Sequence, residues 1–159
     1  MKTMLSFVAV TSVLFFVTGL ACAQETSGVS RVFLMDTSKS GPTVTQMPDV
    51  QWVKYDSLKT GIDSKGAHLA TLYSVPNSNI QLAALKIEKG GYIALHTGPG
   101  TYPMYVAAGK GRATFKDGNK LEYKAGDVIV YMPNHYHTHE NIGDEELLIV
   151  FTRILPLIK

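Results

Sequence analysis

The sequence predicts an all-β protein, an antiparallel sandwich or barrel, and three of its features lead to that fold class. After residue 24, no segment keeps apolar residues at helical spacing over about three turns. Short runs rich in β-branched and aromatic residues recur at intervals of roughly ten residues. Glycine-containing turns separate these runs, and Asp117-Gly118-Asn119 between two of them is a hairpin signal. Many short strands joined by such turns are typical of antiparallel sandwiches and barrels.

The expected strands follow one another between these turn signals. Residues 24–50 carry Ser, Thr, Gly and Pro without a sustained pattern, and we expect an extended lead-in with residues 31–35 as an edge strand. From residue 51 onward the pattern is that of one β domain, residues 51–159. Its expected strands cover 68–74, 80–88, a short strand from the Gly90-Gly91 turn to His96, then 103–108, 112–116, 120–124, 128–132, 135–141 and 146–155.

The composition excludes several classes of protein. With 159 residues, 45% hydrophobic and 18% charged, the chain suits a single folded domain and not a disordered protein. The net charge of +2 comes from scattered residues, so no nucleic-acid partner is expected. A single cysteine excludes an internal disulfide and a cysteine-based zinc site.

Residues 1–23 have the pattern of a secretory signal peptide. Lys2 precedes an apolar run, and Ala21-Cys22-Ala23 forms a small-x-small cleavage site. Cleavage after Ala23 would export the chain to the periplasm or the medium, with no membrane attachment afterwards. A membrane anchor is disfavoured because polar residues and Gly19 interrupt the apolar run. A lipoprotein modified at Cys22 is the less favoured alternative, since Gly19 stands where a lipobox usually carries leucine.

Three of the five histidines alternate in the sequence. If residues 135–141 form a strand, His135, His137 and His139 point to one face of it. Neutral imidazoles on one surface are suited to a metal site or to proton transfer. A polar outer face is the alternative interpretation of the same pattern.

Glycine and histidine spacing in the second half of the chain resembles the two motifs of the cupin superfamily. The first motif, G(X)5HXH(X)3–4E(X)6G, fits at Gly90, His96 and Gly109. The chain departs from it where the second histidine and the glutamate are expected, at Gly98 and Tyr102. Two of the four usual metal ligands are therefore replaced.

The second motif, G(X)5PXG(X)2H(X)3N, fits at its two ends. Gly126, His137 and Asn141 keep the family spacing. Pro133 is shifted by one place, and Asn134 stands at the following glycine position. The resemblance covers about residues 52–155. It implies an antiparallel jelly-roll barrel with the site inside its mouth.

The resemblance also implies a metal site. Cupins bind Fe, Mn, Zn, Ni or Cu through three nitrogens and a carboxylate, and here His96 and His137 hold ligand positions. His139, two residues along the same strand face, could add a third ligand. Pairing of two copies as a homodimer through their outer sheets is a further expectation. The apolar tail, residues 147–158, would then be a contact, although an ordinary core strand is the favoured interpretation of it.

Three functions remain open for such a site. The leading hypothesis is a metal-dependent lyase, isomerase or oxygenase acting on a small molecule in the barrel. The second is a metal-free isomerase or epimerase, with a histidine base, His137 or His96, and Tyr102 as the acid. The third is non-catalytic binding of a small ligand in a pocket that Gly98 enlarges. Arg112 and Arg153 are expected to lie far from the mouth, which disfavours a nucleotide sugar.

Overall fold

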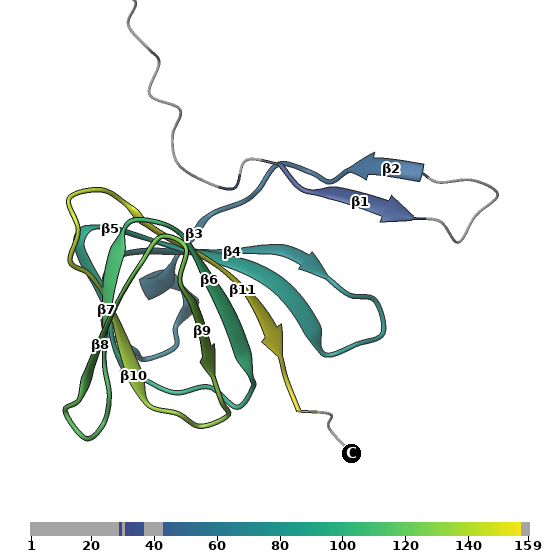
Figure 1. Cartoon of the computed structure of the whole chain (residues 1–159). Helices are drawn as coiled ribbons and strands as arrows, with labels where there is room; N and C mark the ends of the chain where they lie inside the picture. Colours follow the sequence, from purple (N-terminus) through teal and green to yellow (C-terminus); the bar gives the residue numbers. More distant parts are fainter. Residues whose placement is uncertain (1–28, 30, 37–42, 157–159) are drawn as a thin grey trace, which may run out of the picture.

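The computed structural model describes residues 29, 31–36 and 43–156. The predicted signal peptide, residues 1–23, lies outside these described residues. The fold is all-β, as the sequence predicts, and the strands curl into an antiparallel half-barrel of jelly-roll type (Figure 1). Among the described residues there is no helix with the length and apolar character needed to cross a bilayer.

The elements follow one another with short connections. In chain order they are β1 (Phe33–Asp36), β2 (Thr43–Gln46), β3 (Val53–Lys54), the 3-10 helix η1 (Tyr55–Leu58), β4 (Ser64–Ser74), β5 (Ile80–His96), β6 (Tyr102–Ala108), β7 (Lys110–Thr114), β8 (Lys120–Lys124), β9 (Val128–Tyr131), β10 (His137–Asn141) and β11 (Leu147–Ile154).

One long strand, β5, links the two halves of the barrel. The main sheet has nine strands, and seven of them follow the order β8-β7-β10-β5-β11-β6-β9. The first part of β5, from Ile80 to Ile87, pairs with β11 on one side and β4 on the other. Its last part pairs with β10. Because β5 belongs to both halves, it brings β10 and β11 to face a common interior.

The expected break at Gly90-Gly91 is a bend inside β5. Gly90 has a φ of +68°, a backbone conformation that favours glycine. A Cβ on Gly91 would lie 2.6 Å from the Lys65 carbonyl oxygen, so only glycine fits there. The pairing with β4 jumps from Ala67↔Ile87 to Lys65↔Tyr92, which is an irregularity of the bulge type. The two glycines therefore bend the strand without ending it.

The lead-in forms a separate hairpin. β1, expected as an edge strand over 31–35, pairs with β2 in a two-stranded sheet of its own (Figure 1). Apolar residues on either side of this hairpin pack on the outer face of the barrel, against Ala70, Leu72 and Ala84. These residues are Val29, Val32, Val50 and Trp52.

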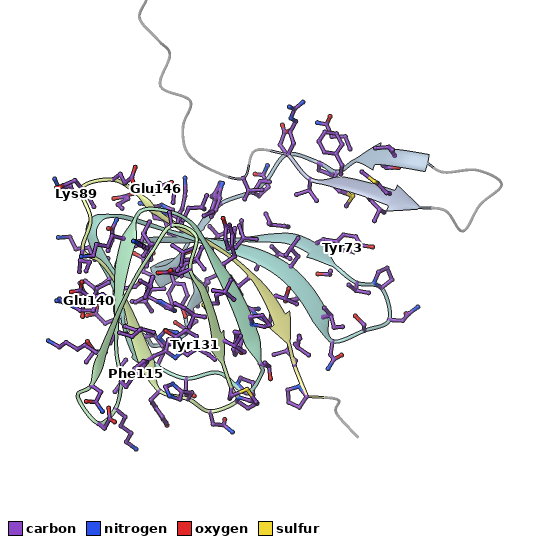
Figure 2. All side chains as sticks on the ribbon, viewed as in Figure 1. Tyr73, Lys89, Phe115, Tyr131, Glu140 and Glu146 are labelled. Atoms are coloured by element: carbon purple, nitrogen blue, oxygen red, sulfur yellow. The ribbon has the colours of Figure 1, made fainter. Side chains whose placement is uncertain are left out.

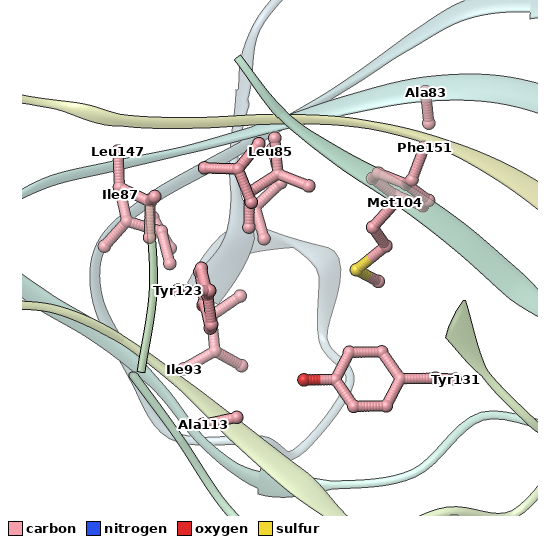
Figure 3. Close-up of a cluster of buried hydrophobic side chains, with 13 residues drawn as sticks. Ala83, Leu85, Ile87, Ile93, Met104, Ala113, Tyr123, Tyr131, Leu147 and Phe151 are labelled. Atoms are coloured by element: carbon pink, nitrogen blue, oxygen red, sulfur yellow. The ribbon is translucent and has the colours of Figure 1, made fainter. Parts of the chain in front are cut away.

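The core lies inside the curled sheet. Ile87, Ile93 and Leu147, on β5 and β11, are at most 1% exposed and point to the same interior (Figure 3). Charged groups lie outside it. Figure 2 shows Glu140 on the outer side of the sheet, and its carboxylate pairs with Arg112 there. β11 is a central strand between β5 and β6, so residues 147–154 belong to the core sheet.

Candidate metal centre

Three histidines from two neighbouring strands meet inside the barrel. His96 ends β5, and His137 and His139 lie on β10. His137 stands opposite His96 in the antiparallel pairing of these strands. One nitrogen from each of the three rings lies within 4.8 Å of one nitrogen of the others. The arrangement is therefore compact enough for one metal ion to contact all three.

A bulge directs His96 inward. The pairing advances two residues on β10, from His137 to His139, and three on β5, from His96 to Ile93. Strict alternation from the buried Ile93 would turn Leu95 inward and His96 outward. Instead Leu95 is 47% exposed, because the extra residue reverses the alternation.

His135 does not join the group. The sequence predicts a strand over 135–141 with three histidines on one face, but β10 begins only at His137. Asn134 before it has a φ of +61°, which belongs to a turn and interrupts the strand. His135 is exposed, while His137 and His139 are 4% and 1% exposed.

Hydrogen bonds orient two of the rings for metal binding. His96 Nδ1 lies 2.9 Å from the Ala94 carbonyl oxygen, and His137 Nδ1 lies 2.9 Å from that of His135. A carbonyl only accepts, so each Nδ1 must donate, and each Nε2 then carries a free lone pair. Fixing a histidine through its other ring nitrogen is the usual support for a metal ligand.

Tyr123 plays the corresponding role for His139. The Tyr123 hydroxyl lies 2.9 Å from His139 Nδ1, and both groups are buried. When the Nδ1–H donates to this hydroxyl, the Nε2 of His139 is also free to bind a metal. Tyr131 supports the centre from another side, since its ring stacks on His137 at 3.8 Å with an interplanar angle of 7°. Figure 3 shows the Tyr131 ring projecting into the interior.

The interior keeps all these groups neutral. Burial lowers the pKa of His96 and of His139, and it lowers that of His137 to about 4. A proton on one ring would also repel protons on its neighbours. Burial raises the pKa of Tyr123 and of Tyr131. At neutral pH the centre offers uncharged imidazoles, the form in which histidine binds metals.

The histidines line one end of a cavity of about 330 Å³. Tyr102 lines the same cavity, so the structure brings together all four site residues that the sequence predicts. The other walls are mostly apolar. They include Ile62, Leu69, Leu85, Ile93, Met104 and Phe151.

Comparison with known proteins identifies the fold family. Residues 84–153, which include His96, His137 and His139, match the model of the cupin domain family. Residues 84–153 thus form a cupin domain, and the barrel as a whole has the cupin fold. A comparison with curated protein sequences finds no match.

Solved structures share the barrel at low sequence identity. A cupin-2 domain protein from Rhodospirillum rubrum is 16% identical, with a TM-score of 0.58 over 72% of this chain and 76% of that one. A predicted oxalate decarboxylase from Thermotoga maritima is 24% identical, with a TM-score of 0.55 over 67% and 92% of the two chains. The polyketide cyclase RemF from Streptomyces resistomycificus is 15% identical, with a TM-score of 0.56 over 65% and 72%.

The two departures of this cupin from the first motif compensate for each other. A Cβ on Gly98 would collide with the hydroxyl end of Tyr102. The tyrosine ring therefore occupies the space that a side chain at position 98 would need. The sequence predicts that Gly98 enlarges the pocket, and that prediction is wrong because Tyr102 fills the volume.

One expectation about charge is also wrong. Arg153 was expected far from the mouth, yet it lines the same cavity as the histidines. Strand alternation contains the signal: Leu147, Ile149 and Phe151 are buried, and Arg153 continues that series on β11. Arg112 does lie away from the cavity, since it pairs with Glu140 on the outer face.

The contact between Gly98 and Tyr102 predicts a coupled pair of substitutions. Gly98→Ala alone should destabilise the protein by about 1 kcal/mol, because the Tyr102 ring must shift. In a Tyr102→Ala background the same change should cost nearly nothing. Denaturant unfolding of the wild type, both single variants and the double variant measures the coupling energy. Additive effects of the two substitutions would contradict this packing.

Proposed function

We propose that this cupin is a metal-dependent enzyme that holds a divalent transition metal at His96, His137 and His139 and acts on a small molecule in the barrel. One observation carries the proposal: three ring nitrogens lie within 4.8 Å of one another, on imidazoles that burial keeps neutral. Fe, Mn, Zn, Ni and Cu are the candidate ions, and imidazole suits several of them.

The donor set fits a catalytic centre better than a structural one. Three protein ligands leave coordination positions open for water or substrate, as catalytic sites require. A metal bound there would supply Lewis-acid chemistry to an oxygen of the substrate. The chain itself provides apolar walls around the site. It also provides the Tyr102 hydroxyl, a proton donor that lines the same cavity. Lyase, isomerase and oxygenase chemistry are the reaction classes we propose.

The metal-free alternative gives His137 the role of a general base paired with Tyr102. Both residues line the cavity, which favours the pairing. Burial, however, lowers the pKa of His137 to about 4. A general base works best when its pKa is near the operating pH, so this histidine is better suited to bind a metal. Non-catalytic binding of a small ligand would use the same cavity without either role.

Metal content tests the proposal directly. Protein purified without a histidine tag or nickel resin should hold about one equivalent of transition metal after loading and desalting. His96→Ala and His139→Ala should each lower the affinity about tenfold or more, because each removes one of three ligands. Elemental analysis by mass spectrometry measures the stoichiometry, and competition with a chelator measures the affinity.

The matched control is His135→Ala, which removes an exposed histidine of the same segment and should leave metal binding unchanged. Less than about a tenth of an equivalent in the loaded wild type would contradict the proposal. Turnover by such metal-free protein would favour the pair of His137 and Tyr102. Ligand binding without turnover would favour the non-catalytic alternative.

We also propose that the protein pairs as a homodimer.

A separate proposal is that the protein is exported after removal of residues 1–23. The apolar run and the small-x-small site support export. When the full chain is expressed in a bacterial host, the protein recovered from the periplasm should begin at Gln24. Retention of Met1 in the cytoplasmic fraction alone would contradict export. A protein that begins at Cys22 and carries lipid would favour the lipoprotein instead.

A further inference from the structure

Arg153 places a positive charge in the cavity that the histidines share. It lies near the end of β11, where its side chain continues the inward series of that central strand. Of the described residues that line the cavity, it is the only one that carries a formal charge when the histidines are neutral. It is half-buried, so its charge is incompletely solvated.

The guanidinium has only a weak partner within the protein. Arg153 Nη1 donates to the Gln81 side-chain oxygen at 3.3 Å, a long hydrogen bond to a neutral group. Each of the ion pairs found among the described residues uses another cation. Arg112 shows the contrast, since its guanidinium contacts Glu140 at 2.6 and 3.2 Å. Most of the five N–H donors of Arg153 are therefore left for a ligand.

Two tyrosines line the cavity together with Arg153. Tyr55, from η1, and Tyr102, from β6, line the same cavity. Burial raises the pKa of Tyr55, and the charge of Arg153 acts on the same hydroxyl in the opposite direction. Neutral hydroxyl groups beside a guanidinium add hydrogen-bond donors for an anion.

We infer that the ligand of this cavity is a small monocarboxylate whose carboxylate binds Arg153 and whose apolar body extends over Phe151 and Leu85. The inference rests on the proposed function of the same cavity and names its substrate class. One fork-shaped cation matches one carboxylate in charge and geometry. The volume of about 330 Å³ and the apolar walls fit a compact hydrocarbon or aromatic body.

A pair of nearly isosteric probes tests the inference. Phenylacetate and phenylacetamide have similar shapes, but only the first carries a charge. Calorimetric titration of the metal-free wild type should show phenylacetate binding about tenfold to a hundredfold more tightly. In Arg153→Met this preference should disappear while binding of the amide persists, because the apolar walls are unchanged. Arg112→Met, the same substitution on the outer face, should keep the full preference.

Three results would overturn the inference. The wild type shows no preference for the acid, Arg153→Met retains the preference while its melting temperature is native, or phenylphosphonate binds more tightly than phenylacetate. Tighter binding of phenylphosphonate would mean that the cavity prefers a dianion to a carboxylate.

The titrations separate this inference from the metal proposal. The preference for the acid is measured in metal-free protein, so it can hold or fail whether or not the protein binds a metal. A preference that appears only after metal loading and survives Arg153→Met would place the carboxylate on the metal. That outcome would contradict the role of Arg153 but would not contradict the proposed metal centre.

Discussion

The antiparallel pairing of β5 with β10 is the constraint on which the rest of this structure depends. It sets His137 opposite His96, and His139 follows on the same face. A slip of one residue in this register would turn the β10 histidines to the outer face of the barrel. The carbonyl oxygen of Ala94 on β5 and that of His135, just before β10, orient two of the rings. The position of the site thus comes from one strand pair, and the backbone of that pair and of the turn before β10 orients the rings.

The environment of that pair explains why neutral imidazoles are stable there. The apolar core disfavours a charged ring, and three rings in contact disfavour it further. Tyr123 and Tyr131 complete the surroundings with a hydrogen bond and a stacked ring. A divalent metal bound there would share the cavity with the positive charge of Arg153, which lines it too.

Part of this arrangement could be predicted from the sequence. Alternation places His137 and His139 on one face, and the resemblance to the cupin motifs implies that they meet His96. The inward direction of His96 could not be derived from alternation, because the bulge in β5 reverses it. The contact of Gly98 with Tyr102 depends on how a loop folds back, which no local pattern encodes. The inward position of Arg153 could be predicted from the alternation along β11. It was missed because Arg153 lies far along the chain from the motifs.

The central claim is that three imidazole nitrogens bind one metal ion, and X-ray absorption spectroscopy of the zinc-loaded protein tests it most directly. The spectrum should require three nitrogen ligands at about 2.0–2.1 Å, with the multiple-scattering features of imidazole. In His139→Ala the fit should require two such ligands. A first shell of oxygen alone in the wild type, or one unchanged in His139→Ala, would contradict the account.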